Sequence, residues 1–162
     1  MIQHTEKHLY DFLKKIMEEE TMKDKGFKVY RGFLPSNNFE DRENGKKTND
    51  YFPFVILRAV EFSQERENFN DYNSFADFEI WIGSKEEKEE DYINNLAVGD
   101  YIREKMLEES TKDGSFAVDQ TKEFKVTFHS DASEPYFYSR ITFSVYAEPI
   151  TSKIEMFRRI VK

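Results

Sequence analysis

The feature that most limits the fold is a pair of strand-like segments separated by a short polar stretch. Residues 51–62, YFPFVILRAVEF, are apolar on both faces over their middle, as a central strand should be. Residues 75–84, FADFEIWIGS, alternate between two faces instead. One face carries Phe78, Ile80 and Ile82, and the other carries Asp77, Glu79 and Trp81. Because only the polar residues 63–73 separate the two segments, we expect a long hairpin joined by a loop.

The remaining patterns predict helices at two places and three further strands. The N-terminal helix is indicated by apolar residues at i, i+3, i+4, i+7 and i+8, namely Leu9, Phe12, Leu13, Ile16 and Met17. A strand is expected at 26–33, a second helix at 88–109, and strands at 123–130 and 139–148. The order αβββαββ predicts an α+β domain, a mainly antiparallel sheet with two helices packed on one face.

Length and composition favour one folded domain. We expect a single α+β domain over residues 1–149 of the 162-residue chain, an exposed polar loop at 35–50, and a C-terminal extension at 150–162. The aromatic share of 16% is too high for a disordered chain. No apolar run approaches the ~18 residues of a membrane span, and no signal peptide is visible, so we expect a soluble intracellular protein with no membrane partner.

The charge balance and the absence of cysteine exclude several kinds of site. The chain has 24 basic and 32 acidic residues, a net charge of −8, which argues against specific or broad nucleic-acid binding. With no cysteine, disulfides and thiolate metal sites are excluded. The run KEEKEEDY at 85–92 follows Gly83, but the glycines of a phosphate-binding loop are missing. We therefore interpret this run as an acidic helix start, which suits the helix dipole.

Few residues offer catalytic or metal-binding chemistry. His4 and His8 have i, i+4 spacing with Asp11 close by, but all three should face solvent, so we expect no metal and no cofactor. His129 is followed by Ser130 and Asp131, yet a working triad is assembled across a fold rather than along a strand. We therefore expect no catalytic residues.

A set of polar-face residues instead predicts a protein interface. Trp81 shares its face with Asp77 and Glu79, and aromatic residues are enriched at interfaces. In the second helix, Asp100 and Arg103 fall within the arc of Tyr92, Ile93, Leu96, Met106 and Leu107 and have i, i+3 spacing. They either extend outward to solvent or pair at a subunit contact. The predicted interface residues are Asp77, Glu79, Trp81, Asp100, Arg103, Tyr136 and Tyr138.

The element order and several segments together resemble the tail-terminator, or tail-completion, proteins of long-tailed bacteriophages and prophages. The segments are PFVILRAVEF, FEIWIG, the acidic linker, NNLAVGDYIREKML, Phe116 and YSRITFSVYAEP. The resemblance covers residues 1 to 149 and implies a structural virion protein without enzymatic activity. Such a protein forms a hexameric ring at the head-proximal end of the tail, or of a headless tail-like bacteriocin.

The resemblance also implies partners and a location. The ring stops elongation of the tail tube and forms the tail side of the head–tail joint, so the partners are further copies, the tail tube protein and a head–tail connector or collar protein. The protein is made in the host cytoplasm. DNA passes through the ring, and an acidic subunit would let it slide.

Two other classes of function stay open. The first is a small hydrolase or nuclease that uses Asp77, Glu79 and His129, which requires these groups to converge in a pocket. The second is a monomeric regulatory module that binds another protein.

Overall fold

The computed structural model describes residues 2–34, 51–66, 72–110, 116–129 and 136–146. Three helices and six strands are formed there, in the order α1 (Ile2–Met17), α2 (Glu20–Lys23), β1 (Lys28–Arg31), β2 (Phe54–Arg66), β3 (Tyr72–Lys85), α4 (Glu89–Glu109), β4 (Ala117–Val118), β5 (Lys125–His129) and β6 (Tyr136–Tyr146). The α+β fold is therefore confirmed, with α2 and β4 as short additions. The expected loop 35–50 and extension 150–162 lie outside the described residues.

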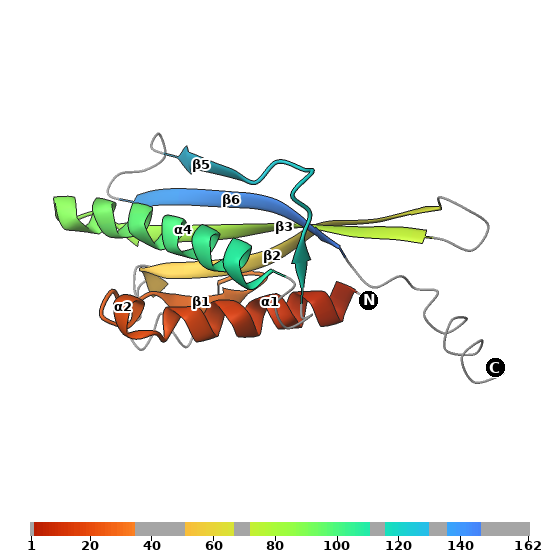
Figure 1. Cartoon of the computed structure of the whole chain (residues 1–162). Coiled ribbons are helices and arrows are strands. Elements are labelled where there is room, and N and C mark those ends of the chain that lie inside the picture. The colour runs from red at the N-terminus through yellow and green to blue at the C-terminus, as the bar shows by residue number, and fades with distance from the viewer. Residues whose placement is uncertain (1, 35–50, 67–71, 111–115, 130–135, 147–162) are drawn as a thin grey trace, which may run out of the picture.

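The strands form one sheet in the spatial order β1-β2-β3-β6, with β4 and β5 both paired to β6 (Figure 1). Only β1 runs parallel to its neighbour, β2, and the other described pairs are antiparallel. The expectation of a mainly antiparallel sheet is thus confirmed. The two edges of the sheet are formed by β1 with the distal part of β2, and by β4 with β5.

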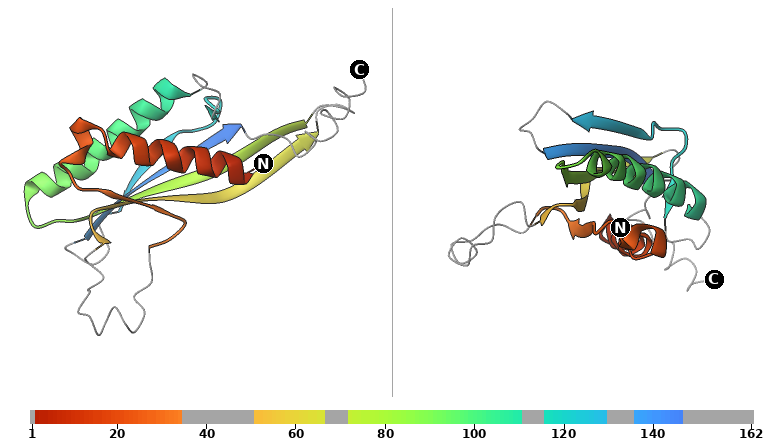
Figure 2. Two further views of the ribbon diagram at one scale, coloured as in Figure 1. Left: turned by 90° about the horizontal axis from the view of Figure 1, so that it is seen from below. Right: turned by 90° about the vertical axis from the view of Figure 1, so that its left-hand side faces the viewer.

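Both long helices lie on the same side of the sheet (Figure 2). We call this side the inner face and the opposite side the outer face. The core lies between the helices and the inner face, and its members are fully or nearly fully buried: Leu9, Leu13, Ile16, Val55, Leu57, Phe78, Ile80, Ile82, Val98, Ile102, Met106, Ile141, Phe143 and Val145. The alternation over 77–82 therefore gave the correct face for each side chain. Phe116 is also buried, and its ring lies edge-on to Phe12 at 5.1 Å.

The buried face of α4 differs from the predicted arc. Tyr92 and Ile93 are exposed, while the helix buries Asn95, Val98, Gly99, Ile102 and Met106. Asn95 tolerates burial because its amide donates to the Ser84 hydroxyl at 2.9 Å and its carbonyl accepts from the Ser139 hydroxyl.

Because α4 buries a different side than predicted, the two charged residues expected within its apolar arc lie outside the buried side. Asp100 is exposed and Arg103 is half-buried. Within the described residues the two side chains form no ion pair with each other, which agrees with the alternative in which they extend outward to solvent; their pairing at a subunit contact stays a prediction.

The β2–β3 hairpin is longer than predicted. Its register runs from Phe54↔Gly83 to Arg66↔Tyr72, so most of the segment 63–73 that we expected to be a loop is strand. The last β3–β6 pair is Phe75↔Tyr146. The end of the hairpin therefore continues as a two-stranded ribbon beyond the rest of the sheet (Figure 1). None of the described helices is both long and apolar enough to cross a lipid bilayer.

Candidate functional site: the outer face of the sheet

The outer face brings together five of the seven predicted interface residues. Strand pairing places Asp77, Glu79 and Trp81 of β3 on the same side as Tyr136 and Tyr138 of β6. All five are half-buried. The other two, Asp100 and Arg103, belong to α4, which packs on the inner face. The structure therefore assembles one surface from the strands and leaves the helix pair apart from it.

A three-residue cluster lies near the middle of this surface. Trp81 is paired across strands with Arg140, whose guanidinium carbon is 5.5 Å from the indole centroid. The His129 ring of β5 stacks on the indole, with centroids 5.4 Å apart and an interplanar angle of 28°. Trp81 thus contacts both a cation and an imidazole, in contacts worth about 0.5–2 kcal/mol each.

This cluster contains hydrogen-bonding capacity that the described fold does not use. The Trp81 Nε1, His129 Nε2 and Arg140 Nε atoms are buried and have no hydrogen-bond partner within the described chain. Buried unpartnered nitrogens are uncommon because each loses its hydration without compensation. Three of them in one contact group mark the outer face as the least satisfied part of the described fold.

Aromatic rings cover the adjoining end of the outer face. The Phe52 ring centroid lies 4.8 Å from those of Phe54 and Tyr136, and 6.1 Å from that of Tyr138. Phe54 crosses directly over Gly83, so a Cβ atom at this position would overlap the Phe54 ring and force it to move. Burial, followed by the nearby Tyr136, raises the pKa of the Tyr138 phenol, so this hydroxyl is uncharged at neutral pH.

The other half of the outer face is polar, and its carboxylates already have partners. Glu79 forms an ion pair with Arg58 at 3.8 Å, and Asp77 accepts a hydrogen bond from the Ser144 hydroxyl. These are ordinary cross-strand interactions of a half-exposed sheet face.

The groups proposed for a hydrolase or nuclease do not converge. On β6, Asp77 is opposite Ser144, Glu79 is opposite Thr142 and His129 is opposite Tyr138. At ~3.4 Å per residue, Asp77 is roughly 20 Å and Glu79 roughly 14 Å from His129 along the strands. This arrangement contradicts a shared pocket for the three groups. The Ser130 and Asp131 that follow His129 lie outside the described residues.

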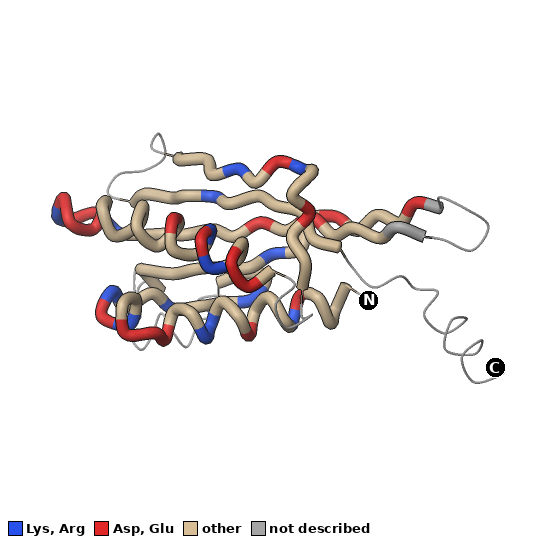
Figure 3. Tube along the Cα trace, in the orientation of Figure 1, with Lys and Arg blue, Asp and Glu red and all other residues tan. Residues whose placement is uncertain are grey.

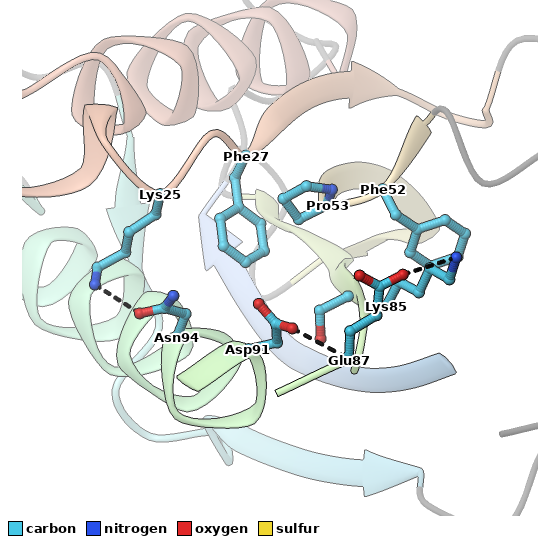
Figure 4. A pocket seen from close by; sticks show the side chains of 9 residues that line it. Lys25, Phe27, Phe52, Pro53, Lys85, Glu87, Asp91 and Asn94 are labelled. Carbon is cyan, nitrogen blue, oxygen red and sulfur yellow. Dashed lines mark hydrogen bonds and ion pairs between the residues drawn. The ribbon is translucent and has the colours of Figure 1, made fainter. Parts of the chain in front are cut away.

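A separate cavity of about 240 Å³ lies where β3 ends and α4 begins (Figure 4). Its charged groups are matched: Lys85 pairs with Glu87 at 3.0 Å, and Lys25 donates to Asn94 at 2.9 Å. The Asp91 carboxylate accepts the backbone amide hydrogens of Glu87 and Lys88, both at 3.0 Å. Asp91 thus supplies the negative charge that a helix start favours, which confirms our interpretation of the run 85–92.

The histidines of α1 lie on the surface. His4, His8 and Asp11 are all exposed, and Asp11 pairs with Lys7 at 3.3 Å. Among the residues that the structure describes, no group of three His, Asp or Glu side chains could hold a metal ion.

Sequence reasoning missed Arg140 and the Phe52–Phe54 pair as parts of the surface. Alternation along 139–148 contained the signal for Arg140, because Ile141, Phe143 and Val145 define the inner side. No comparable signal existed for Phe52 and Phe54, since the apolar run 51–62 does not distinguish its two faces. Neither a scan against models of known protein families nor a search of curated proteins found a match for this chain.

Proposed function

We propose that this chain is a structural subunit of the phage tail-terminator kind. Several copies form a ring, hexameric by the resemblance, on the head-proximal end of a tail tube. The ring stops tube elongation and provides the tail side of the head–tail joint, so the protein belongs to the virion. The proposal includes no bond-making or bond-breaking chemistry, metal or cofactor.

The outer face of the sheet carries the proposal. Trp81, Tyr136 and Tyr138 present half-buried rings on a face that no described helix covers. Large rings bury much area against a partner and lose few rotamers when they do so, which is why interfaces favour them. Arg140 on the same face adds a half-buried guanidinium, a group that is also enriched at interfaces.

Two further observations support the same class of function. The αβββαββ order expected from the resemblance is present, apart from the short α2 and β4. The net charge of −8 suits a subunit that DNA must pass without being held, because bound phosphates would add salt-sensitive affinity.

The test is a tube-elongation assay. Tubes polymerised from the tail tube protein of the same genome should stop at a shorter mean length when this chain is added, with a ring at one end in electron micrographs. The double variant Trp81→Ala/Arg140→Ala should need a concentration at least ~10-fold higher to cap the tubes, which corresponds to a loss of about 1.4 kcal/mol in binding free energy.

The matched control is Lys14→Ala on the exposed side of α1, which should cap tubes like the unmodified chain. Circular dichroism of each variant checks that the fold is kept. Unmodified protein that leaves tube length unchanged, or a double variant that caps normally, would contradict the proposal.

The monomeric binding module remains the alternative that uses the same surface. It differs from a terminator in one measurable respect, because it would bind its partner as a single copy. The mass of the complex on a tube end therefore separates the two functions.

A further inference from the structure

A cavity of about 480 Å³ lies between the end of α4 and the turn that joins β4 to β5. Its apolar walls are Leu107 of α4, the buried Val118 of β4 and Phe124, which is half-buried like Leu107. The Ser110 hydroxyl at the end of α4 accepts the Val118 amide hydrogen at 2.9 Å, so β4 is held beside the helix end (Figure 1). Ligand pockets span roughly 300–1,000 Å³ and are mostly apolar, so this cavity has the dimensions and lining of a binding site.

The cavity also contains a buried carboxylate with one oxygen that the described fold does not use. Asp119 lines the cavity and is 2% exposed. Its Oδ1 atom accepts hydrogen bonds from the Thr121 hydroxyl and amide and from the Tyr146 hydroxyl, whereas its Oδ2 atom accepts none from the described residues. Burial acts to raise the pKa of this carboxyl, but the hydrogen bonds outweigh burial and lower the pKa, so the group is ionised at neutral pH.

Apolar walls around one ionised oxygen favour a ligand that is apolar along its length and carries a cation. Nitrogen donors that are themselves charged form the strongest hydrogen bonds to a carboxylate. Among the described lining residues Lys122 is the only base, and its ammonium lies 4.3 Å from the Phe75 ring centroid rather than in an ion pair with Asp119. The matching ligand is therefore an apolar segment with a lysine or an arginine.

The chain leaves the described fold beside this cavity. β6 ends at Tyr146, which pairs with Ala117 of β4 and whose hydroxyl donates to Asp119 at 3.2 Å. Residues 147–162 follow it in the sequence. Since an extended chain advances roughly 3.3 Å per residue, the residues from 147 to 150 can cover about 13 Å. The segment from Ile150 onward is thus close enough to reach the cavity.

The sequence of this segment matches the ligand that the cavity favours. Four of its apolar residues have the spacing of one helical face, i, i+4, i+7 and i+11: Ile150, Ile154, Phe157 and Val161. At about 100° per residue, Lys153 and Arg158 border this face on its two sides, and Arg159 is opposite to it. Residues 150–161 therefore combine an apolar face with cations at its margins.

The charges of the two parts are complementary. Residues 147–162 hold four basic and two acidic residues, whereas the whole chain carries a net charge of −8. Beside the cavity, residues 100–109 of α4 hold four acidic and two basic residues (Figure 3). One of these bases, Lys105, pairs with Glu19 at 4.0 Å. A net-positive segment is therefore attracted to this end of α4.

We propose that the cavity at Asp119 binds the C-terminal segment of the same chain. Residues 150–161 dock as a helix with their apolar face on Leu107 and Phe124, and the Arg158 guanidinium donates to Asp119 Oδ2. Arg158 is favoured over Lys153 because a guanidinium is more weakly hydrated than an ammonium and loses less when it is partly buried. This docking goes beyond the proposed function and does not depend on it.

The test is amide hydrogen exchange in the full chain, followed by mass spectrometry. A helix as short as residues 150–161 is marginally stable alone in water, so protection of these amides requires packing against the fold. In the unmodified protein they should exchange at least ~10-fold more slowly than in an unstructured peptide of the same sequence. This factor should not change with protein concentration, because the segment docks within its own chain.

Two pairs of variants examine the contact itself. Arg158→Gln should lower the protection by at least ~5-fold, while its matched control Arg159→Gln should leave it unchanged. Gln120→Lys places a cation in the exposed part of the lining and should also lower the protection, whereas Gln3→Lys on the exposed side of α1 should not. In the Asp119→Asn background, Arg158→Gln should cause no further loss.

Exchange of the α4 amides in the same samples checks that each variant keeps its fold. Rapid exchange of residues 150–161 in unmodified protein, or equal losses in Arg158→Gln and Arg159→Gln, would overturn the inference. So would full protection in Gln120→Lys, or an undiminished effect of Arg158→Gln in the Asp119→Asn background. Protection that increases with protein concentration would place the segment on a second copy and overturn docking within the chain.

Discussion

The two faces of the sheet are built from the same strands but satisfy their polar and apolar groups to different degrees. On the inner face, Phe78, Ile80 and Ile82 are almost completely buried beneath the helices, and the buried Asn95 has hydrogen-bond partners. On the outer face, Trp81 and Arg140 are half-buried and hold unpartnered nitrogens. The inner face is therefore fully packed and hydrogen-bonded, whereas the outer face keeps half-buried rings and buried nitrogens without partners in the described chain.

The largest expected difference between the faces is in the free energy of unfolding after loss of a ring. Phe78 is 1% exposed and stacks on Phe143 at 6.0 Å, so Phe78→Ala should cost about 3–5 kcal/mol through lost burial and a residual cavity. Trp81→Ala on the outer face should cost less than half as much. Urea denaturation measures both, and equal losses would remove the distinction between the faces.

A smaller loss is expected from the polar contact between α4 and the inner face. Asn95→Ala should cost about 2 kcal/mol, because the hydroxyls of Ser84 and Ser139 would remain buried without their partner. The check is a double-mutant cycle with Ser139→Ala. We expect the second substitution to cost less in the Asn95→Ala background than alone, and strict additivity would disprove the coupling.

The contribution of Asp119 to the free energy of unfolding should depend on pH. This residue follows β4 and accepts a hydrogen bond from Tyr146 of β6. Burial acts to raise the pKa of this carboxyl, but hydrogen bonds from the Thr121 hydroxyl and amide and from Tyr146 outweigh it and lower the pKa. Because the pKa of Asp119 is lower in the folded chain than in the unfolded chain, where it is about 3.9, the ionised carboxylate stabilises the fold at pH values above about 3.9. This stabilisation is lost as the pH falls through the folded pKa.

Asp119→Asn should therefore cost about 1 kcal/mol at pH 7. The difference from unmodified protein should stay constant down to about pH 5 and shrink below about pH 4. Chemical denaturation at several pH values measures this change. A difference that grows as the pH falls would show that the carboxylate is not stabilised by these hydrogen bonds.

The smallest expected effect concerns an unpartnered nitrogen of the outer face. Trp81→Phe keeps an aromatic ring on His129 and removes an indole N–H that has no acceptor in the described chain. Its unfolding free energy should change by less than about 0.5 kcal/mol. A loss above about 1 kcal/mol, measured by circular dichroism in urea, would mean that this N–H is used in folding.

Strand faces were predictable where one side of a strand is apolar and the other is not. The alternation over 77–82 therefore placed Trp81 correctly on the outer face. The ribbon at 63–66 and 72–74 was missed because its polar strands lack that contrast. Strands 63–66 and 72–74 pair by continuing the register of the hairpin, and residue composition alone does not indicate where that pairing ends.

The buried side of α4 was predicted wrongly for a different reason. Hydrophobicity placed Tyr92 and Ile93 inside, but the helix buries Asn95 and Gly99. Asn95 can be buried because a serine of β3 and a serine of β6 are positioned to hydrogen-bond its side chain. The pattern of a single helix does not contain such long-range partners, so the sequence could not indicate which side of α4 is buried.

The chain has one tryptophan, and it lies on the outer face stacked against His129. Its intrinsic emission is therefore a probe of this surface that needs no added label. A shift to shorter wavelength when the tail tube protein is added would mean that water has left the indole. Emission that stays constant while copies associate would place their contact elsewhere, so one optical signal distinguishes the two kinds of encounter.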